Sequence, residues 1–187
     1  MRIVGGAFKG HSLATPQRAG TRPTSDRVRE AVFNVLAHGF EGPDIDGANV
    51  LDIFAGTGAL GLEALSRGAA SCLFIETDAR ARALVRRNIE ALKLEGVARL
   101  FRRDATNMGP RKSGDAASFV FADPPYGFGL GEQALASLRD GDWLRVGATV
   151  VLEERALVHV SWPDRFIPVD ERVYGDTRVH FARYMPK

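Results

Sequence analysis

Cysteine is almost absent from this 187-residue chain, which contains only Cys72. A single cysteine excludes an intramolecular disulfide and any zinc or iron–sulfur centre built on several cysteines, so we expect no bound metal. Long apolar runs are also lacking. No stretch approaches the about 20 residues of a membrane span, and the N-terminus has no run typical of a signal peptide. These absences predict a cytoplasmic protein with no membrane partner.

Excess charge of either sign is lacking as well. The formal net charge is +2, although 26% of the residues are charged and 45% are hydrophobic. A chain of this size and composition can bury the core of one domain, which argues against a disordered basic tail. Any binding of nucleic acid must therefore depend on locally clustered positive charge.

Acidic residues are absent from residues 1–25, where glycine and proline are frequent. We expect residues 1–20 to form a small, mobile basic arm appended to a main domain of residues 21–187. Residues 2–4 and 11–14 could pair as a hairpin across the glycines. Because the arm contains little apolar surface, we expect its removal to leave the fold and cofactor binding intact. The basic residues of the segment 1–25 are Arg2, Lys9, Arg18 and Arg22.

Helical and strand patterns alternate through most of the remaining chain. A first helix is expected from Thr24 or Ser25 to near Gly39. The alternation that follows is typical of a doubly wound α/β fold with a mostly parallel sheet. The expected strands are 50–54, 72–76, 98–101, 118–122 and 149–152, and the expected helices are 60–66, 79–94 and 130–138.

The last part of the chain has a different pattern. Residues 166–173 and 177–184 alternate apolar with polar side chains around a Gly175-Asp176 turn. This pattern predicts an antiparallel hairpin that closes one edge of the sheet. With the five earlier strands it makes a seven-stranded sheet.

A glycine-rich loop follows the first expected strand. Gly56, Gly58 and Gly61 satisfy the pattern G-x-G-x-x-G, which allows a sharp turn and a close approach of a ligand to the backbone. Glu76 ends the second expected strand, where an acidic residue would bind a ribose. These features alone also suit a nicotinamide oxidoreductase. The pyrophosphate of its dinucleotide cofactor would lie at the N-terminus of the helix that follows the loop.

Asp52 favours a cationic ligand over a dinucleotide. Its carboxylate precedes the loop, where it would repel a diphosphate and attract a sulfonium compound such as S-adenosyl-L-methionine. The alternative is a capping or ion-pairing role at the strand end. The pattern D-x-F-A-G-x-G resembles the first motif of Rossmann-like methyltransferases, and this resemblance implies that Glu76 binds the ribose and Asp104 faces the adenine. The candidate cofactor-binding residues are Asp52, Phe54, Ala55, Gly56, Thr57, Gly58, Glu76, Thr77, Asp104 and Ala105.

Asp123-Pro124-Pro125-Tyr126 directly follows the expected strand 118–122, and ligands of open α/β sheets bind at the carboxyl ends of strands. The amino nitrogen of a nucleobase is a poor nucleophile because its lone pair is delocalised into the ring. The Asp123 carboxylate and the Pro124 carbonyl could hold its N–H groups and direct the lone pair at a methyl carbon. Pro125 stiffens the loop, and Tyr126 offers a stacking face worth about 1–3 kcal/mol. A merely stiff exit from the strand is the alternative.

With these motifs, the whole chain resembles the bacterial small-subunit (16S) ribosomal RNA guanine-N2 methyltransferases. The resemblance implies a Rossmann-like class I methyltransferase fold, S-adenosyl-L-methionine as cofactor and transfer of a methyl group to a guanine N2 of 16S ribosomal RNA. It further implies a partly assembled small subunit as partner and an N-terminal arm that helps to hold RNA. The matching stretches are residues 2–6, 9–10, 22–30, 52–68, 75–76 and 123–126.

The basic residues of the arm and the first helix are the candidate RNA contacts. A solvated basic face is the alternative interpretation. A DNA amino-methyltransferase acting on adenine N6 or cytosine N4 is the nearest rival function, although the chain leaves little room for a target-recognition domain. A non-catalytic nucleic-acid-binding module is a rival of another class. The candidate RNA contacts are Arg2, Lys9, Arg18, Arg22, Arg27 and Arg29.

Overall fold

The computed structural model describes residues 1–16, 26–39 and 41–186 of the chain. Two candidate RNA contacts, Arg18 and Arg22, and the expected start of the first helix lie outside the described residues. Within the described part, no helix combines the length and hydrophobicity that a bilayer span requires.

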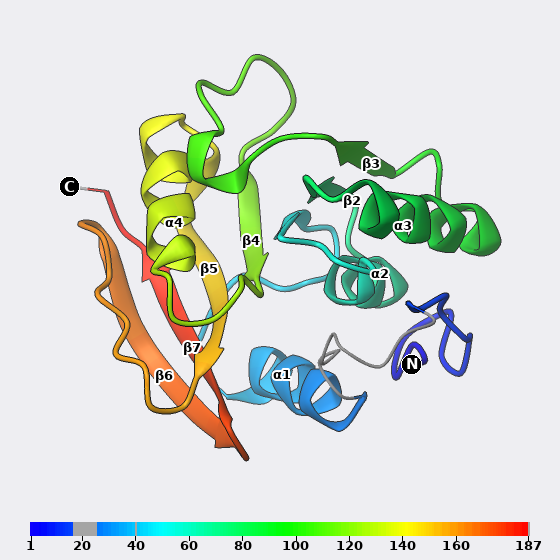
Figure 1. Cartoon of the computed structure of the whole chain (residues 1–187), viewed down its shortest axis with the longest axis horizontal. Coiled ribbons are helices and arrows are strands. Elements are labelled where there is room, and N and C mark those ends of the chain that lie inside the picture. The colour runs from blue at the N-terminus through cyan, green and yellow to red at the C-terminus, as the bar shows by residue number, and fades with distance from the viewer. Residues whose placement is uncertain (17–25, 40, 187) are drawn as a thin grey trace.

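Seven strands form one central sheet (Figure 1). They are β1 (Asn49–Ile53), β2 (Ser71–Ile75), β3 (Ala98–Phe101), β4 (Ala117–Ala122), β5 (Leu144–Arg155), β6 (Phe166–Tyr174) and β7 (Thr177–Tyr184). Their order is β3-β2-β1-β4-β5-β7-β6. The pairs from β3 to β5 are parallel, whereas β7 runs antiparallel to β5 and β6. The structure thus confirms a mostly parallel seven-stranded α/β sheet with an antiparallel C-terminal hairpin.

The strand β5 is longer than the sequence pattern predicts. The apolar run suggests only residues 149–152, but the strand spans Leu144–Arg155. Its second half pairs with β7 as far as Arg155, so the hairpin extends the strand beyond its apolar part. This extension brings Glu153 and Glu154 into the sheet, where both side chains are buried.

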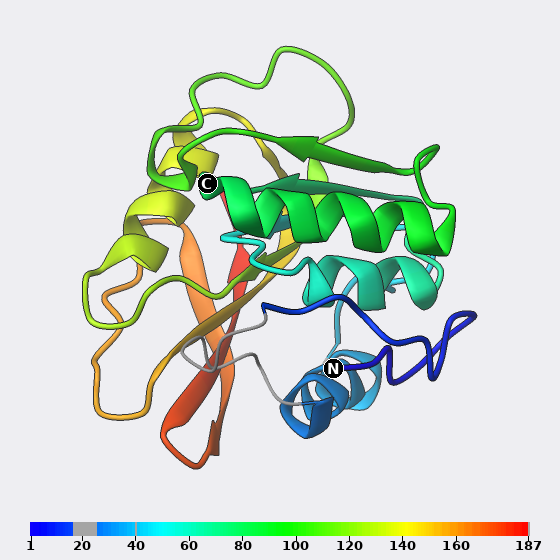
Figure 2. The same cartoon turned by 45° about the vertical axis from the view of Figure 1, so that its right-hand side comes forward.

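The helices are divided between the two faces of the sheet (Figure 2). Apolar residues of α1, α2 and α3 pack on one face with Phe74 and Phe121, and those of η1 and α4 pack on the other with Ile53 and Val120. The side chain of Asp78 caps α3 by accepting a hydrogen bond from the Ala81 N–H at 2.8 Å. The bounds are α1 (Asp26–His38), α2 (Ala59–Ser66), α3 (Ala79–Leu92), η1 (Ala105–Asn107) and α4 (Leu130–Asp140).

Residues 1–16 pack against the domain beside α2 and α3 (Figures 1 and 2). The expected hairpin is confirmed by an antiparallel bridge between Arg2 and Ser12. The expectation that these residues contribute little to the core is wrong, because Ile3 and Leu13 are only 1% and 6% exposed within the main hydrophobic cluster. Two apolar anchors were enough to fix the arm because neighbouring polar side chains bind its backbone.

Candidate cofactor and catalytic site

The candidate residues gather at one edge of the sheet. The strand order reverses between β1 and β4, and in open α/β sheets the ligand site lies at the carboxyl ends of the strands at such a point. The glycine loop follows β1, and Glu76, Asp104 and Asp123 follow β2, β3 and β4 respectively. The parallel pairing of these four strands brings their carboxyl ends to the same edge.

The glycine loop has an irregular backbone that its glycines allow. Gly56 and Gly58 have φ of 57° and 78°, and Phe54 also has a positive φ of 62°. The Gly58 N–H donates to the Ala55 carbonyl at 2.7 Å, which closes the turn before α2. Gly61 is needed for packing, since a Cβ there would lie 2.5 Å from a ring carbon of Phe74. The three glycines therefore have distinct physical roles.

Asp52 lies beneath this loop, in the interior. Its side chain is 2% exposed, and its Oδ2 accepts a hydrogen bond from the Gly61 N–H at 2.9 Å. Burial raises its pKa well above the ordinary value of 3.8, and the nearby carboxylates of Asp123 and Glu76 raise it further. The observed contact is structural, because it anchors the first turn of α2 to β1. A contact with the cofactor stays a prediction.

Glu76 connects two loops. Its Oε2 accepts from the Gly56 N–H at 2.9 Å, and its Oε1 accepts from the Asp78 N–H at 2.8 Å. The side chain is half-buried, and the neighbouring Thr77 is exposed. A carboxylate oxygen can accept more than one hydrogen bond, so these contacts leave capacity for ligand hydroxyls. Glu76 fixes the shape of the glycine loop whatever else it binds.

Asp104 caps the short helix η1 through its Oδ1. This oxygen accepts from the Thr106 N–H at 2.9 Å and from the Thr106 hydroxyl at 2.7 Å. Asp104 is exposed, while Ala105 is 3% exposed and belongs to the core. The cap turns the chain after β3 and leaves the carboxylate at the surface.

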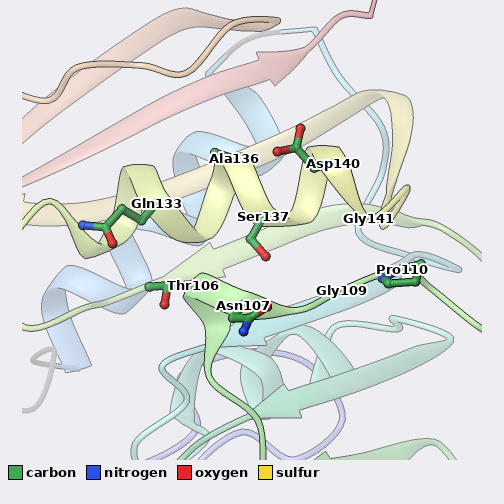
Figure 3. Close-up of a pocket in the computed structure, with 9 residues that line it drawn as sticks. All are labelled: Thr106, Asn107, Gly109, Pro110, Gln133, Ala136, Ser137, Asp140 and Gly141. Carbon is green, nitrogen blue, oxygen red and sulfur yellow. The ribbon is translucent and has the colours of Figure 1, made fainter.

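A cavity of about 490 Å³ lies between η1 and α4 (Figure 3). It adjoins the Asp104 cap, because Thr106 is part of its wall, but its lining includes neither Glu76 nor Asp123. In Figure 3 the side chain of Ser137 points from α4 toward η1, and its Oγ accepts from the Met108 N–H at 2.7 Å. This contact fixes the distance between η1 and α4. The cavity is lined by Thr106, Asn107, Gly109, Pro110, Gln133, Ala136, Ser137, Asp140 and Gly141.

The Asp123-Pro124-Pro125-Tyr126 loop leaves β4 at the same edge. Asp123 and Tyr126 are half-buried, Pro124 is buried and Pro125 is exposed. The Tyr126 hydroxyl donates to Glu153 Oε2 at 3.4 Å. Burial raises the pKa of Tyr126, and the nearby Asp123 carboxylate raises it further, so the hydroxyl stays protonated as a donor. The ring is thus held at its far end.

Two carboxylates from β5 hold this loop, and the sequence interpretation missed both. Glu153 and Glu154 are 2% and 3% exposed. The Gly127 N–H donates to both carboxylate oxygens of Glu154, at 3.1 Å each. The available signal was a pair of adjacent acids directly after the apolar run of β5, which is unusual at a buried strand end.

The polar residues that hold the arm were also missed. Glu63 of α2 is fully buried and accepts from the Val4 N–H at 2.8 Å. Asn88 of α3 is 2% exposed and accepts from the Ala14 N–H at 2.7 Å. Helical periodicity places both residues on inward faces, where an unpaired polar group is costly and therefore indicates a partner.

The candidate RNA contacts separate into two groups. Arg2, Lys9 and Arg27 are exposed. Arg29 is wrong as an RNA contact because its side chain is fully buried, with its Nε 3.5 Å from Glu63 Oε2. A buried guanidinium needs carboxylate partners inside the protein, and it has two, since its Nη2 also lies 2.9 Å from Asp26 Oδ1. Periodicity alone could have placed Arg29 on the inner side of α1, next to Val32 and Phe33.

No group of three or more metal-ligating side chains occurs among the residues that the structure describes.

Three features of this sheet define the class of protein. A glycine loop follows the first strand, an acidic residue follows the second and Asp-Pro-Pro-Tyr follows the fourth. The protein is a methyltransferase with a Rossmann-like fold. The structure of a candidate methyltransferase of Escherichia coli, yhhF, superposes with a TM-score of 0.84 at 36% identity, covering 100% of this chain and 99% of that one.

The chain belongs to the family described as conserved hypothetical protein 95, whose sequence profile matches residues 1–183. It is 43% identical over 153 residues to ribosomal RNA small subunit methyltransferase D of Escherichia coli strain K12, covering 82% of this chain and 74% of the relative. The protein of the same description from Haemophilus influenzae is 32% identical over 177 residues, covering 94% of this chain and 89% of the relative.

Proposed function

We propose that the protein transfers a methyl group from S-adenosyl-L-methionine to the exocyclic N2 of a guanine in 16S ribosomal RNA, within a partly assembled small subunit. The observation that carries the proposal is the position of Asp123 beside the glycine loop: Ile53 pairs with Ala122 in the parallel register of β1 and β4, so the glycine loop and Asp123 leave the sheet side by side. The relatives described as ribosomal RNA small subunit methyltransferases support small-subunit ribosomal RNA as the substrate.

The glycine loop fits the cofactor. A Cβ added to Gly56 would meet nothing closer than the Phe54 carbonyl at 4.0 Å, so the space beside this backbone is open to a ligand. We expect the loop to bind the amino-acid end, Glu76 to accept from the ribose hydroxyls and Asp104 to face the adenine. When bound, S-adenosyl-L-methionine supplies an electrophilic methyl carbon. The remaining candidate contacts are Asp52, Phe54, Ala55, Thr57, Gly58, Thr77 and Ala105.

The catalytic loop would orient the guanine amine. The Asp123 carboxylate and the Pro124 carbonyl accept its two N–H groups, so the nitrogen lone pair is directed toward the methyl carbon. Tyr126 stacks on the base, while its hydroxyl is held by Glu153. The nitrogen–methyl bond would form as the methyl–sulfur bond breaks, with S-adenosyl-L-homocysteine as the leaving group, and the proton of the nitrogen would pass to Asp123 and then to solvent. Catalysis is thus mainly positioning, with Asp123 as the orienting acceptor.

The RNA would be held by exposed basic side chains. Arg2 and Lys9 lie on the arm and Arg27 lies on α1, and all three are exposed. Arg18 and Arg22 lie outside the described residues and stay candidates from the sequence. Phosphate contacts of this kind supply affinity and orientation without reading the sequence.

The decisive experiment uses labelled S-adenosyl-L-methionine with three substrates: small subunits from a methylation-deficient strain, protein-free 16S ribosomal RNA and duplex DNA. Digestion to nucleosides should recover the label in N2-methylguanosine, mainly from the subunit sample. Label in methylated adenine or cytosine of the DNA would favour the amino-methyltransferase of DNA instead. Absence of label from all three would contradict the proposed function.

A further inference from the structure

Asn88 joins the N-terminal arm to the glycine loop. Its Oδ1 accepts from the Ala14 N–H at 2.7 Å, and its Nδ2 donates to the Ala14 carbonyl at 3.2 Å and to the Thr57 carbonyl at 3.0 Å. The side chain is 2% exposed, so water does not compete for these hydrogen bonds. One buried amide therefore binds both polar groups of an arm residue and one carbonyl of the loop.

The loop needs such an external restraint. Thr57 lies between Gly56 and Gly58, both with positive φ, and glycine restricts its own backbone less than any other residue. The Thr57 hydroxyl also donates to the sulfur of Met1 at 3.4 Å. The arm thus reaches the same loop residue at two points, through Asn88 and through Met1.

We propose that Asn88 is a positioning residue that keeps the glycine loop in its binding conformation before the cofactor arrives, and that it thereby makes residues 1–16 part of the cofactor site. This inference rests on the proposed function in that it takes the glycine loop as the cofactor's binding site. A loop ordered in advance loses less conformational entropy on binding, which raises affinity. The arm therefore contributes to cofactor affinity as well as to any RNA contact, contrary to the expectation from the sequence.

The test compares Asn88→Ala with Arg87→Ala, a control on the exposed side of the same helix. Calorimetric titration with S-adenosyl-L-homocysteine should show affinity weaker by about 3- to 30-fold for Asn88→Ala, the range expected for losing buried hydrogen bonds, and unchanged for the control. At saturating cofactor, kcat should change little, because Asn88 does not contact the reacting atoms. Equal affinity in both variants would overturn the proposal.

Asn88→Asp removes the contact with the loop and keeps one contact with the arm. It keeps an acceptor for the Ala14 N–H but loses the donor to the Thr57 and Ala14 carbonyls. If the loop contact matters, this variant should bind S-adenosyl-L-homocysteine as weakly as Asn88→Ala. Wild-type affinity would show that the Ala14 N–H contact alone is sufficient, and it would overturn the proposal.

A second readout needs no ligand. In the cofactor-free protein, amide hydrogen exchange in residues 55–60 should be faster in Asn88→Ala than in Arg87→Ala, while α4 exchanges alike in both. Exchange that is faster throughout the Asn88→Ala variant, or that is no faster at the loop, would contradict a local role. Wild-type protein that fails to bind S-adenosyl-L-homocysteine would instead contradict the proposed function, and the exchange result would still decide the role of Asn88.

Discussion

The two loops at the carboxyl edge of the sheet are restrained in opposite ways. The glycine loop has little stiffness of its own, and side chains from other elements hold it: Glu76 binds the Gly56 N–H, and Asn88 binds the Thr57 carbonyl. The Asp123–Tyr126 loop contains two consecutive prolines, which fix their own φ angles and restrict the preceding residue. Side chains of β5 add to the restraint of this loop, which the prolines already provide.

We expect this difference to separate the determinants of cofactor affinity from those of chemistry. Residues that shape the glycine loop are scattered over the end of β2, α3 and the arm, so cofactor affinity should depend on side chains far apart in the sequence. The proposed reacting groups lie within four consecutive residues, 123–126. Substitutions should therefore sort into those that weaken cofactor binding and those that stop transfer.

The largest effect is expected at Asp123. Asp123→Ala should reduce methyl transfer to background, because no other carboxylate of the catalytic loop can orient the amine, while S-adenosyl-L-homocysteine affinity stays within a few-fold of wild type. Single-turnover methylation and calorimetric titration measure the two quantities separately. Asp123→Asn is the matched control and should keep some activity, since its amide oxygen still accepts one hydrogen bond. Equal losses of affinity and of transfer would contradict the separation of the two loops.

At Glu76 the opposite pattern is expected. Glu76→Ala removes the proposed ribose acceptor and also the observed restraint on the Gly56 N–H. Cofactor binding should weaken by about 1–3 kcal/mol, the cost of losing a charge-assisted hydrogen bond in a partly buried site. Glu76→Gln keeps an acceptor and should lose less. Unchanged affinity in calorimetric titration would mean that neither contact matters for the cofactor.

Sequence alone predicted what depends on local patterns. The strands are short apolar runs, the glycine loop and Asp-Pro-Pro-Tyr are contiguous, and the closing hairpin has a clear turn at Gly175-Asp176. These signals located the sheet, its parallel core and the edge that carries the candidate site. The hairpin strand β7 was predicted with the bounds that it has, Thr177–Tyr184.

Interactions between distant residues could not be predicted in this way. Arg29 looked like one more basic residue near the arm because Glu63, the buried one of its two carboxylate partners, lies on another helix. The arm looked loosely attached because its apolar residues are few, and no periodic pattern shows that Asn88 binds its backbone. Burial of a polar group is decided by its partner, and pairing across 74 residues of chain is a property of the tertiary fold.

A moderate effect on stability is expected at Asp52, whose pKa is raised by burial above the ordinary 3.8. The folded state favours its protonated form, so its contribution to stability is complete below pH 3.8 and is lost as pH rises toward the raised folded pKa. Asp52→Asn still accepts from the Gly61 N–H and has no proton to lose. Its Tm should exceed that of wild type by more at about pH 8 than at about pH 5. The exposed Asp115→Asn is the control, and a gap that does not widen with pH would contradict this account.

The smallest effect on the glycine loop is expected from the arm's own charges. Arg2 and Lys9 are exposed, whereas the arm's contacts with the loop are made by the Ala14 backbone and the Met1 sulfur. Charge reversal at Arg2 and Lys9 should therefore leave S-adenosyl-L-homocysteine affinity and Tm unchanged.

If the two side chains bind phosphate, the affinity for small subunits should fall, and the slope of log affinity against log salt should decrease by about one for each phosphate that is no longer bound. Binding measured over a series of salt concentrations gives this slope. Reversal at Lys112 and Arg145, which are exposed and distant in sequence from the arm, changes the net charge by the same amount and is the control for net charge. An unchanged slope would leave the arm with its structural role at the cofactor loop alone, whereas a loss of cofactor affinity would mean that charge, and not the buried Asn88 side chain, connects the arm to the loop.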